Sequence, residues 1–527
     1  MSRLVKKSPS VCTDLPLDNT DICNKLHLLR QLLKSCFGPT GRLKQVHNNI
    51  GGHVVTTSTS SVLLPAISSS QPFINLIKTS ILNHVSRFSD CGLFAAVLCL
   101  SLIEHATRSG LSGSVAIRVN THLLGLCTSY LQREDCGCKV KLDFCSSHSL
   151  VALARGVISS KPACALTEQE ALHVSKLAVR AFLLTVPCQS PGEVTLGKIV
   201  TVSVEGHPVL NSAVFPGLLV DAPDVLRVDG LESPLSHPLR VVLFSASLAG
   251  DLAELGDGTI EVHPGADTDL QILDQLLELG KRVVKDEVKL CACQKVVHPV
   301  VQQYLKSHGV VVIERLGITL MEPFAQLTGA RPVATLHTTI PAGAYGQVAC
   351  QKTEHVLRLT LREPSALLGG GCTETHLAAY IRHESTKEVP ETVSALGCSQ
   401  TEHLRGVDSF CRSLESVAAA LEHDGGDSLM DLTHAHRWTH PADLMKGHMG
   451  EESSSICGCG LMESSPNQRW TYLNANYPHF SPAPPSRDAA VRPRVLDSFT
   501  AKVNALQVAV ETANLALDVR YLIQDMN

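Results

Sequence analysis

The fold of this chain is decided by one stretch, Gly369-Gly370-Gly371-Cys372-Thr373-Glu374-Thr375-His376-Leu377-Ala378-Ala379-Tyr380. Its three consecutive glycines leave a bare backbone that can take positive φ and approach a ligand closely. Apolar side chains at helical spacing follow, so a helix is predicted directly after the glycines. Free N–H groups at such a helix start bind phosphate well, but glycine-rich helix starts are also ordinary turn connections. The stretch alone leaves both interpretations open.

Two further segments narrow the choice. Upstream stands Cys36-Phe37-Gly38-Pro39-Thr40-Gly41-Arg42-Leu43-Lys44, and near the end residues 495–525 form a long amphipathic segment. In this order, the three features resemble the group II chaperonins, the ring-forming, ATP-driven folding machines of the eukaryotic cytosol. The resemblance covers nearly the whole chain. It is closest to the Bardet–Biedl chaperonin-like branch of that family, and four segments carry this closer match: 88–94, 159–164, 320–323 and 367–383.

Bulk composition excludes several classes of protein. With 527 residues the chain is too long for one core, so about two to four domains are expected. A hydrophobic content of 44% with 18% charged residues predicts a globular protein rather than a disordered one. The net charge of −5 implies no strongly basic face, which argues against nucleic acid as a main partner.

Cysteines and apolar runs indicate the compartment. The 19 cysteines include several in apolar stretches, such as Cys99, Cys127 and Cys350, where they behave as small buried hydrophobes. The first residues lead into no apolar signal core, so a reducing compartment, cytosol or nucleus, is expected. The longest uncharged apolar run, 92–103, is too short to span a bilayer and predicts a buried core helix, with no membrane insertion.

The pattern of apolar side chains changes twice along the chain. Helical spacing dominates up to about residue 143, again over 150–186, and from 355 to the end. Between them, 200–204, 241–244 and 310–313 are predicted to be strands that alternate with helices around 272–283 and 297–305. Residues 53–64 suit a hairpin. The final stripe is predicted to be core: Val503, Leu506, Val510, Ala513, Leu517 and Tyr521.

The predicted fold class is therefore multidomain α and α/β. The resemblance implies a group II chaperonin-like architecture with these parts: a helical equatorial domain that begins in 1–148 and is completed by 367–527, a small intermediate domain from 149–198 and 345–366, and an α/β apical, substrate-binding domain in 199–344. Between 348 and 355 the family pattern expects a few dozen more residues, so the second intermediate part is predicted to be shortened. A splice form or a gap in the gene model would explain this.

A polar stretch, 434–494, interrupts the last helical part and is predicted to be an irregular surface loop. Its two tryptophans, Trp438 and Trp470, are not expected to anchor a core. It also holds His434, His436, His440 and His448 near Cys457 and Cys459. Zinc sites usually contain C-x₂-C pairs, whereas this pair is C-x-C, so a polar insertion is favoured over a metal site. The pairs Cys136/Cys138 and Cys291/Cys293 are weaker candidates still.

Hydrolysis of ATP needs a phosphate cradle, magnesium and a group that positions water. The resemblance places three acidic residues in such a site. The first is replaced here by the stretch Thr57-Ser58-Thr59, and the third by Lys352. The second survives as Asp90, but the glycines around it have become Ser89 and Cys91, whose Cβ atoms restrict the backbone. Asp90 is a candidate magnesium ligand, although a helix N-cap at the start of 92–103 is the favoured role.

The phosphate cradle is better preserved than the acidic residues. The loop 421–427 resembles a family nucleotide loop in which His423 replaces an asparagine. Weak or absent hydrolysis with residual binding of ATP and magnesium is therefore expected. The candidate nucleotide-binding residues are Gly38, Pro39, Gly41, Lys44, Asp90, Gly369, Gly370, Gly371 and Gly425. No catalytic Ser/His/Asp signature, dinucleotide fingerprint or Walker loop is present.

The resemblance also implies a function. The chain would be a chaperonin-like assembly factor whose clients are subunits of the Bardet–Biedl complex, which serves ciliary traffic. Its partners would be sister chaperonin-like proteins and the cytosolic ring chaperonin, and it would reside in the cytosol and at the centrosome or basal body. The alternative is an active, ATP-hydrolysing chaperonin subunit that folds proteins.

Overall fold

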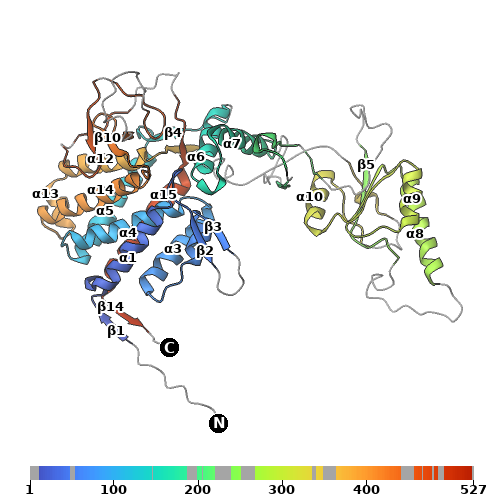
Figure 1. The fold of residues 1–527 in the computed structure, drawn as a ribbon, viewed down its shortest axis with the longest axis horizontal. Helices are drawn as coiled ribbons and strands as arrows, with labels where there is room; N and C mark the ends of the chain where they lie inside the picture. The colour runs from blue at the N-terminus through green and yellow to red at the C-terminus, as the bar shows by residue number, and fades with distance from the viewer. Residues whose placement is uncertain are drawn as a thin grey trace, which may run out of the picture. The chain divides into compact units, whose positions relative to one another are not determined.

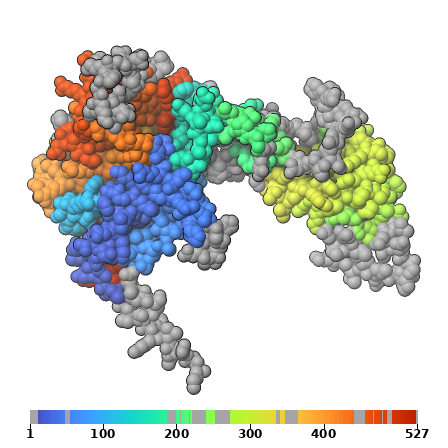
Figure 2. Space-filling model, in the orientation of Figure 1, coloured from blue at the N-terminus to red at the C-terminus, as the bar shows by residue number. Residues whose placement is uncertain are grey.

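The computed structural model divides into two compact units, of which unit 1 contains Met1–Val179 and Val356–Asn527 and unit 2 contains Arg180–His355. The two ends of the chain therefore belong to one unit, which Figure 2 shows as blue and orange-to-red segments side by side. The domain boundaries predicted from the sequence stay a prediction. The structure describes residues 11–47, 54–144, 146–186, 199–203, 206–215, 217–219, 239–250, 268–334, 340–347, 364–440, 456–465, 467–477, 480–484 and 492–524.

Unit 1 is built around helix α4 (Gly92–Arg108). Side chains on every side of this helix are buried, because other helices surround it, as expected for a segment that is apolar all round. The prediction of a buried core helix over 92–103 is confirmed. The surrounding helices are α1 (Thr20–Lys34), α3 (Pro72–Phe88), α14 (Gln400–Ala419) and α15 (Phe499–Asp518), with α5 (Gly113–Gln132) and α12 (Cys372–Lys387) completing the layer (Figure 1).

A small antiparallel sheet joins the first and last parts of unit 1. Strand β9 (Ser365–Leu368) pairs with β13 (Leu496–Ser498) on one side and with β4 (Lys139–Lys141) on the other. Helix α12 begins four residues after β9, and α15 begins directly after β13. The sheet thus fixes where both helices start, and these starts contribute to the site described below.

Shorter elements complete unit 1. Two further sheets are formed by β10 (Asp427–Asp431), which lies between β11 (Arg437–His440) and β12 (Trp470–Tyr472), and by the hairpin β2 (Lys44–His47) and β3 (Val54–Thr57). The first and last described strands, β1 (Val11–Asp14) and β14 (Tyr521–Gln524), pair antiparallel. The remaining helices are α2 (Ser60–Ala66), α6 (Ser147–Ser159), α7 (Glu168–Leu183), which runs across the boundary with unit 2, and α13 (Pro390–Ala395).

Unit 2 contains a sheet in the order β7-β6-β5-β8. Strands β5 (Arg240–Phe244), β6 (Leu290–Cys293) and β7 (Val311–Ile313) are parallel, and β8 (Gly346–Gln347) is antiparallel to β5. Alternate strand residues enter two different cores, as the period of a strand requires. One core contains α8 (Thr268–Lys285) and α9 (Pro299–Ser307), and the other contains α10 (Ile318–Thr328), so helices cover both faces.

Several local predictions are wrong. The hairpin predicted over 53–64 ends at Thr57, and α2 follows, because Ser60 to Ala66 bury an apolar side against α3. Of the strand predicted over 200–204, residues 200–203 form no strand, and Val204 lies outside the described residues. The run 150–186 is helical as predicted, in two helices with a break at Pro162. Tyr521 at the end of the predicted core stripe is 64% exposed and belongs to β14.

The stretch 434–494 is not wholly irregular. It contains β11 and β12, and the indole of Trp438 is only 2% exposed, packed edge-on against Trp470 with ring centroids 4.6 Å apart. The prediction that neither tryptophan anchors a core is therefore wrong for Trp438. Within the described residues, no helix combines the length and apolar character needed to cross a bilayer.

Candidate functional site

A cavity of about 230 Å³ lies within unit 1. The first half of the chain contributes residues 37–39, 90–94 and 159–161, and the second half contributes the glycine stretch, Arg437, Gly458 and the start of α15. Five of the predicted nucleotide-binding residues line this cavity: Gly38, Pro39, Asp90, Gly370 and Gly371. Segments that are more than 300 residues apart in the sequence therefore share one site.

Two helices begin at this cavity without a side-chain cap. The N-cap residue of α12 is Gly371 and that of α4 is Cys91, and neither helix start receives a capping hydrogen bond from a side chain. Thr373, the second residue of α12, donates its hydroxyl to the carbonyl of Leu368 instead. The N–H of Cys372 donates to the carbonyl of Gly369, but both helix starts bring their positive dipole ends to the cavity, which is the arrangement that binds phosphate.

The loop before α4 keeps a backbone that glycine adopts most easily. Ser89 and Cys91 both lie in the left-handed region, with φ of 57° and 60°. At these two positions the resemblance places glycines, so the loop retains its shape although the residues have changed. Left-handed φ costs a non-glycine residue roughly 1–2 kcal/mol, which the surrounding packing must offset.

Asp90 lies between these two residues and lines the cavity. The favoured sequence interpretation, that Asp90 caps α4, is wrong, because Cys91 occupies the N-cap position and no side chain caps the helix. The carbonyl oxygen of Asp90 faces His84 Nε2 at 2.9 Å, which fixes the loop. Its carboxyl group remains a candidate for magnesium.

A buried charge network also lines the cavity. Lys502 of α15 pairs with Glu374 of α12 and with Asp497 of β13, its Nζ lying 2.7 Å from Asp497 Oδ2. Burial alone would lower the pKa of Lys502, but Asp497 and Glu374 outweigh it and the net shift is upward. Lys502 therefore stays charged, and it engages two carboxyl groups that would otherwise face the cavity.

Four predicted residues lie outside the lining. Gly41 closes the turn after α1, where a Cβ would lie 2.4 Å from the carbonyl oxygen of Cys36. Gly369 donates its N–H to the carbonyl of Val495, and the ammonium of Lys44 donates to the carbonyl of Arg42. Gly425 has φ of 84° in an open position. The first three support neighbouring backbone in this structure, and none of the four reaches the cavity.

The nearby loop at 421–427 contacts the first glycine loop. His423 Nε2 lies 2.8 Å from the carbonyl oxygen of Phe37, and a Cβ on Gly38 would lie 2.7 Å from Leu421 Cδ2. Ser58 is buried, and Ser60 of α2 rather than Thr57 lines the cavity. Lys352 lies outside the described residues.

Sequence reasoning missed several lining residues that carry charge: Lys161, Glu374, Arg437, Asp497 and Lys502. Glu374 stood in the quoted glycine stretch, and Lys161 stood in a segment singled out for its resemblance. For Lys502, the available signal was a lysine placed on the buried side of the apolar helix α15.

Comparison with known proteins identifies the family. The model of the TCP-1/cpn60 chaperonin family matches residues 29–356 and 347–527. The chain belongs to this chaperonin family. It is 42% identical to the molecular chaperone MKKS of Homo sapiens and 41% identical to that of Mus musculus, in each case over 571 residues that cover all of both chains. It is 20% identical to the thermosome subunit beta of Sulfolobus acidocaldarius, over 94% of this chain and 88% of that one.

The resemblance to group II chaperonins found in the sequence is thus confirmed, and so is the multidomain α and α/β fold class. The two matches of the family model overlap at residues 347–356, where the sequence predicts a shortened segment.

Proposed function

We propose that this chain is a chaperonin-like assembly factor that binds client subunits and hydrolyses ATP weakly or not at all. One observation carries the proposal: the cavity keeps two uncapped helix starts for phosphate, while Lys502 engages two of its carboxyl groups. Binding of phosphate and hydrolysis make different demands, since hydrolysis also needs metal and an oriented water. This site supports the first demand better than the second.

The residues present fit ATP and magnesium only in part. Gly38, Gly370 and Gly371 provide close backbone approach, and Asp90 offers one carboxylate to a magnesium ion, which binds through one or two carboxylates and keeps several waters. The cavity enclosed by the described residues is about 230 Å³, below the roughly 300–1,000 Å³ usual for small-molecule sites. Weak binding of ATP is the expected result.

Steady-state phosphate release and equilibrium binding of labelled ATP test this proposal on the full chain. We expect background phosphate release that Asp90→Ala does not change, together with weak ATP binding that Asp90→Ala reduces. Asp518→Ala, which changes an exposed aspartate at the end of α15 outside the cavity lining, is the matched control. Robust turnover that depends on Asp90 would instead support the alternative, an active ATP-hydrolysing chaperonin subunit.

Family resemblance supports the choice of clients and location. We propose subunits of the Bardet–Biedl complex as clients, sister chaperonin-like proteins and the cytosolic ring chaperonin as partners, and residence in the cytosol and at the centrosome or basal body. Unit 2 exposes apolar side chains on which a client could dock, among them Phe215, Leu219 and Ile318, which are 71%, 57% and 78% exposed.

Affinity purification of the tagged chain from ciliated cells, with mass determination of the complexes, tests the partners. Co-purification of Bardet–Biedl subunits that is lost in Ile318→Asp supports docking on unit 2. The control is Leu28→Asp, which changes an exposed apolar residue of α1 in unit 1. Recovery of the wild-type chain without these proteins would refute the assignment.

Two exposed sheet edges favour assembly with other chaperonin-like chains. The pair β1–β14 exposes Val11 and Ile523, and the hairpin β2–β3 exposes Val54 and Val55. Two-stranded sheets are marginal by themselves, and open strand edges pair readily with another chain. A chain truncated before β14 should lose its association with chaperonin-like partners; unchanged complex mass would contradict this.

The shortened second intermediate part, 345–366, stays a proposal that the comparisons support. The 571 aligned positions exceed the 527 residues of this chain by 44, and the family model matches in two overlapping pieces at 347–356. Intact-mass measurement of the protein from its natural source decides the matter. A mass of 56.6 kDa would establish the short form, and a heavier chain would show that residues are missing from this sequence.

A further inference from the structure

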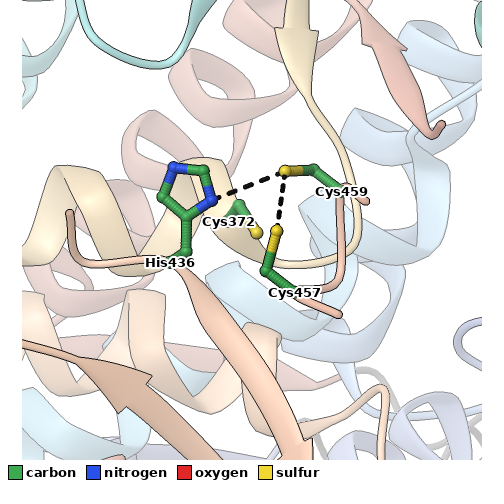
Figure 3. A group of neighbouring side chains, drawn as sticks. All are labelled: Cys372, His436, Cys457 and Cys459. Atoms are coloured by element: carbon green, nitrogen blue, oxygen red, sulfur yellow. Dashed lines mark hydrogen bonds between the residues drawn. The ribbon is translucent and has the colours of Figure 1, made fainter. Parts of the chain in front are cut away.

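Three cysteines and one histidine meet in the interior of unit 1 (Figure 3). Cys372 is the first residue of α12, His436 directly precedes β11, and Cys457 and Cys459 belong to a loop between β11 and β12. All four residues are buried, and their ligand atoms lie within 4.8 Å of one another. Cys457 Sγ lies 3.3 Å from Cys459 Sγ, which in turn lies 3.5 Å from His436 Nδ1.

We propose that Cys372, His436, Cys457 and Cys459 bind a structural zinc ion. Zinc in such sites is tetrahedral, with Zn–S of about 2.3 Å and Zn–N of about 2.0–2.1 Å, so neighbouring ligand atoms are roughly 3.5–3.8 Å apart. The separations of 3.3 and 3.5 Å found here need only small shifts to reach these values. Three sulfurs and one imidazole fill the coordination sphere, which is typical of a structural rather than a catalytic site.

The surroundings suit bound thiolates. The backbone N–H of Met462 donates to Cys457 Sγ at 3.1 Å, and such outer contacts orient metal ligands. The loop that carries His436 is fixed by Asp431, whose carboxylate accepts the His436 backbone N–H at 2.7 Å. Three thiolates and one zinc ion carry a net charge of −1, and the residue that follows His436 is Arg437, whose buried guanidinium also pairs with Glu422 at 3.6 Å.

The pair Cys136 and Cys138, a second C-x-C sequence in unit 1, can be compared with Cys457 and Cys459. Cys136 and Cys138 are buried with their sulfurs 3.4 Å apart, yet among the described residues no third ligand joins them. Short thiol–thiol distance alone therefore does not mark a metal site. The convergence of Cys372 and His436 from two other segments distinguishes the first cluster, and a disulfide between Cys457 and Cys459 would leave that convergence unexplained.

The zinc site would adjoin the candidate nucleotide cavity without being part of it. Gly458, between the two cysteine ligands, faces Gly370 so closely that a Cβ on Gly370 would lie 2.1 Å from the Gly458 carbonyl oxygen. Both glycines and Arg437 line the cavity. A metal that links Cys372 to the C-G-C loop would hold this wall in place in the absence of nucleotide.

Elemental analysis of the full chain, purified under reducing conditions and dialysed against metal-free buffer, tests the proposal. We expect one zinc per chain, and exchange with cobalt should give the visible absorption bands of a tetrahedral thiolate site. Cys457→Ser should abolish both signals, while the matched control Cys136→Ser should keep them. His436→Cys, which offers four sulfurs, should also retain zinc. Urea unfolding of Cys457→Ser followed by tryptophan fluorescence shows whether this variant still folds.

Two results would overturn the proposal. One is a chain that is free of zinc and gives no thiolate bands when cobalt is added. The other is a Cys457–Cys459 disulfide, found by mass spectrometry of alkylated peptides in protein from cells. Neither result depends on ATP or on clients, so the zinc proposal and the proposed function fail separately.

Discussion

Replacing Ser89 by glycine should stabilise unit 1. Ser89 is the C-cap of α3, with φ of 57° and ψ of 6°, and its N–H donates to the carbonyl of Val85. This left-handed position favours glycine, because a Cβ there costs roughly 1–2 kcal/mol. The greater flexibility of glycine in the unfolded chain lowers the free energy of unfolding by about 0.5–1 kcal/mol. The side chain is exposed, so little packing is lost, and a net gain of about 0.5–1 kcal/mol is expected.

The same substitution three residues earlier is the matched control. Ser86 is also exposed but lies inside α3, where glycine is less favourable than serine by about 0.5 kcal/mol. Ser86→Gly should therefore destabilise the protein, although the chemical change is identical. The opposite signs isolate the effect of backbone conformation.

Urea unfolding followed by tryptophan fluorescence measures both variants. The two tryptophans of the chain, Trp438 and Trp470, belong to unit 1, so the signal follows this unit alone. Ser89→Gly should raise the midpoint without changing the slope. A midpoint that falls, as in Ser86→Gly, would show that the loop before α4 does not hold the left-handed conformation, and the argument that it keeps its shape at a cost would fail.

Three further predictions concern unit 1. Glu415→Ala should lower the free energy of unfolding by about 3–5 kcal/mol in urea, because it leaves the buried guanidinium of Arg382 with only the half-exposed Asp408, 4.0 Å away, as a carboxylate partner. Glu388→Gln should lower the free energy of unfolding most between about pH 4.5 and 6.5. The hydrogen bond to Glu388 raises the pKa of His122. The stabilisation that charged His122 provides is therefore lost as the pH rises through this raised pKa. Burial alone would raise the pKa of Glu388, but the contacts with His122 and His403 bring this pKa down to about 2. The stabilisation that the Glu388 carboxylate provides is therefore lost on acidification. Gly370→Ala should cost about 2 kcal/mol or more, since φ is 63° and the Cβ would overlap a facing carbonyl.

Control variants distinguish these specific effects from a general loss of stability on substitution in unit 1. Glu384→Ala removes an exposed pair with Lys387 on the same helix as Arg382 and should cost less than about 1 kcal/mol. A small loss in Glu415→Ala would show that Arg382 finds solvent or another partner. A pH-independent effect of Glu388→Gln would contradict the assigned pKa shifts, and an unchanged midpoint for Gly370→Ala would contradict the close approach of the two loops.

Local pattern was enough to predict elements whose environment is uniform. Helix α4 is apolar on every side because it is surrounded, and β5 and β7 are short apolar runs within a parallel sheet. The glycine loops near 38 and 370 were recognised because few residue types can replace glycine in them. For these elements, the residues of the segment itself are enough to predict the structure.

The residues that were missed depend on neighbours far along the chain. Lys502 is tolerated inside α15 only because Glu374 and Asp497 reach it from other elements. Trp438 is buried because β11 pairs with β10, although its own segment is polar. Cys372 was read as part of a helix start, and its proximity to the C-x-C loop, more than 80 residues away, was not visible in any spacing.

The pairing of the first strand with the last sets the order in which the nascent protein can mature. Unit 2 is contiguous and can form as soon as it has left the ribosome, whereas unit 1 needs β9, β13 and finally β14. At translation rates of about 5–20 residues per second, the helices of the first half wait roughly 20–70 s for their partners. During that interval the apolar sides of α1, α3 and α4 are uncovered. A protein of the chaperonin family would thus itself be a demanding client of whatever chaperones attend its synthesis.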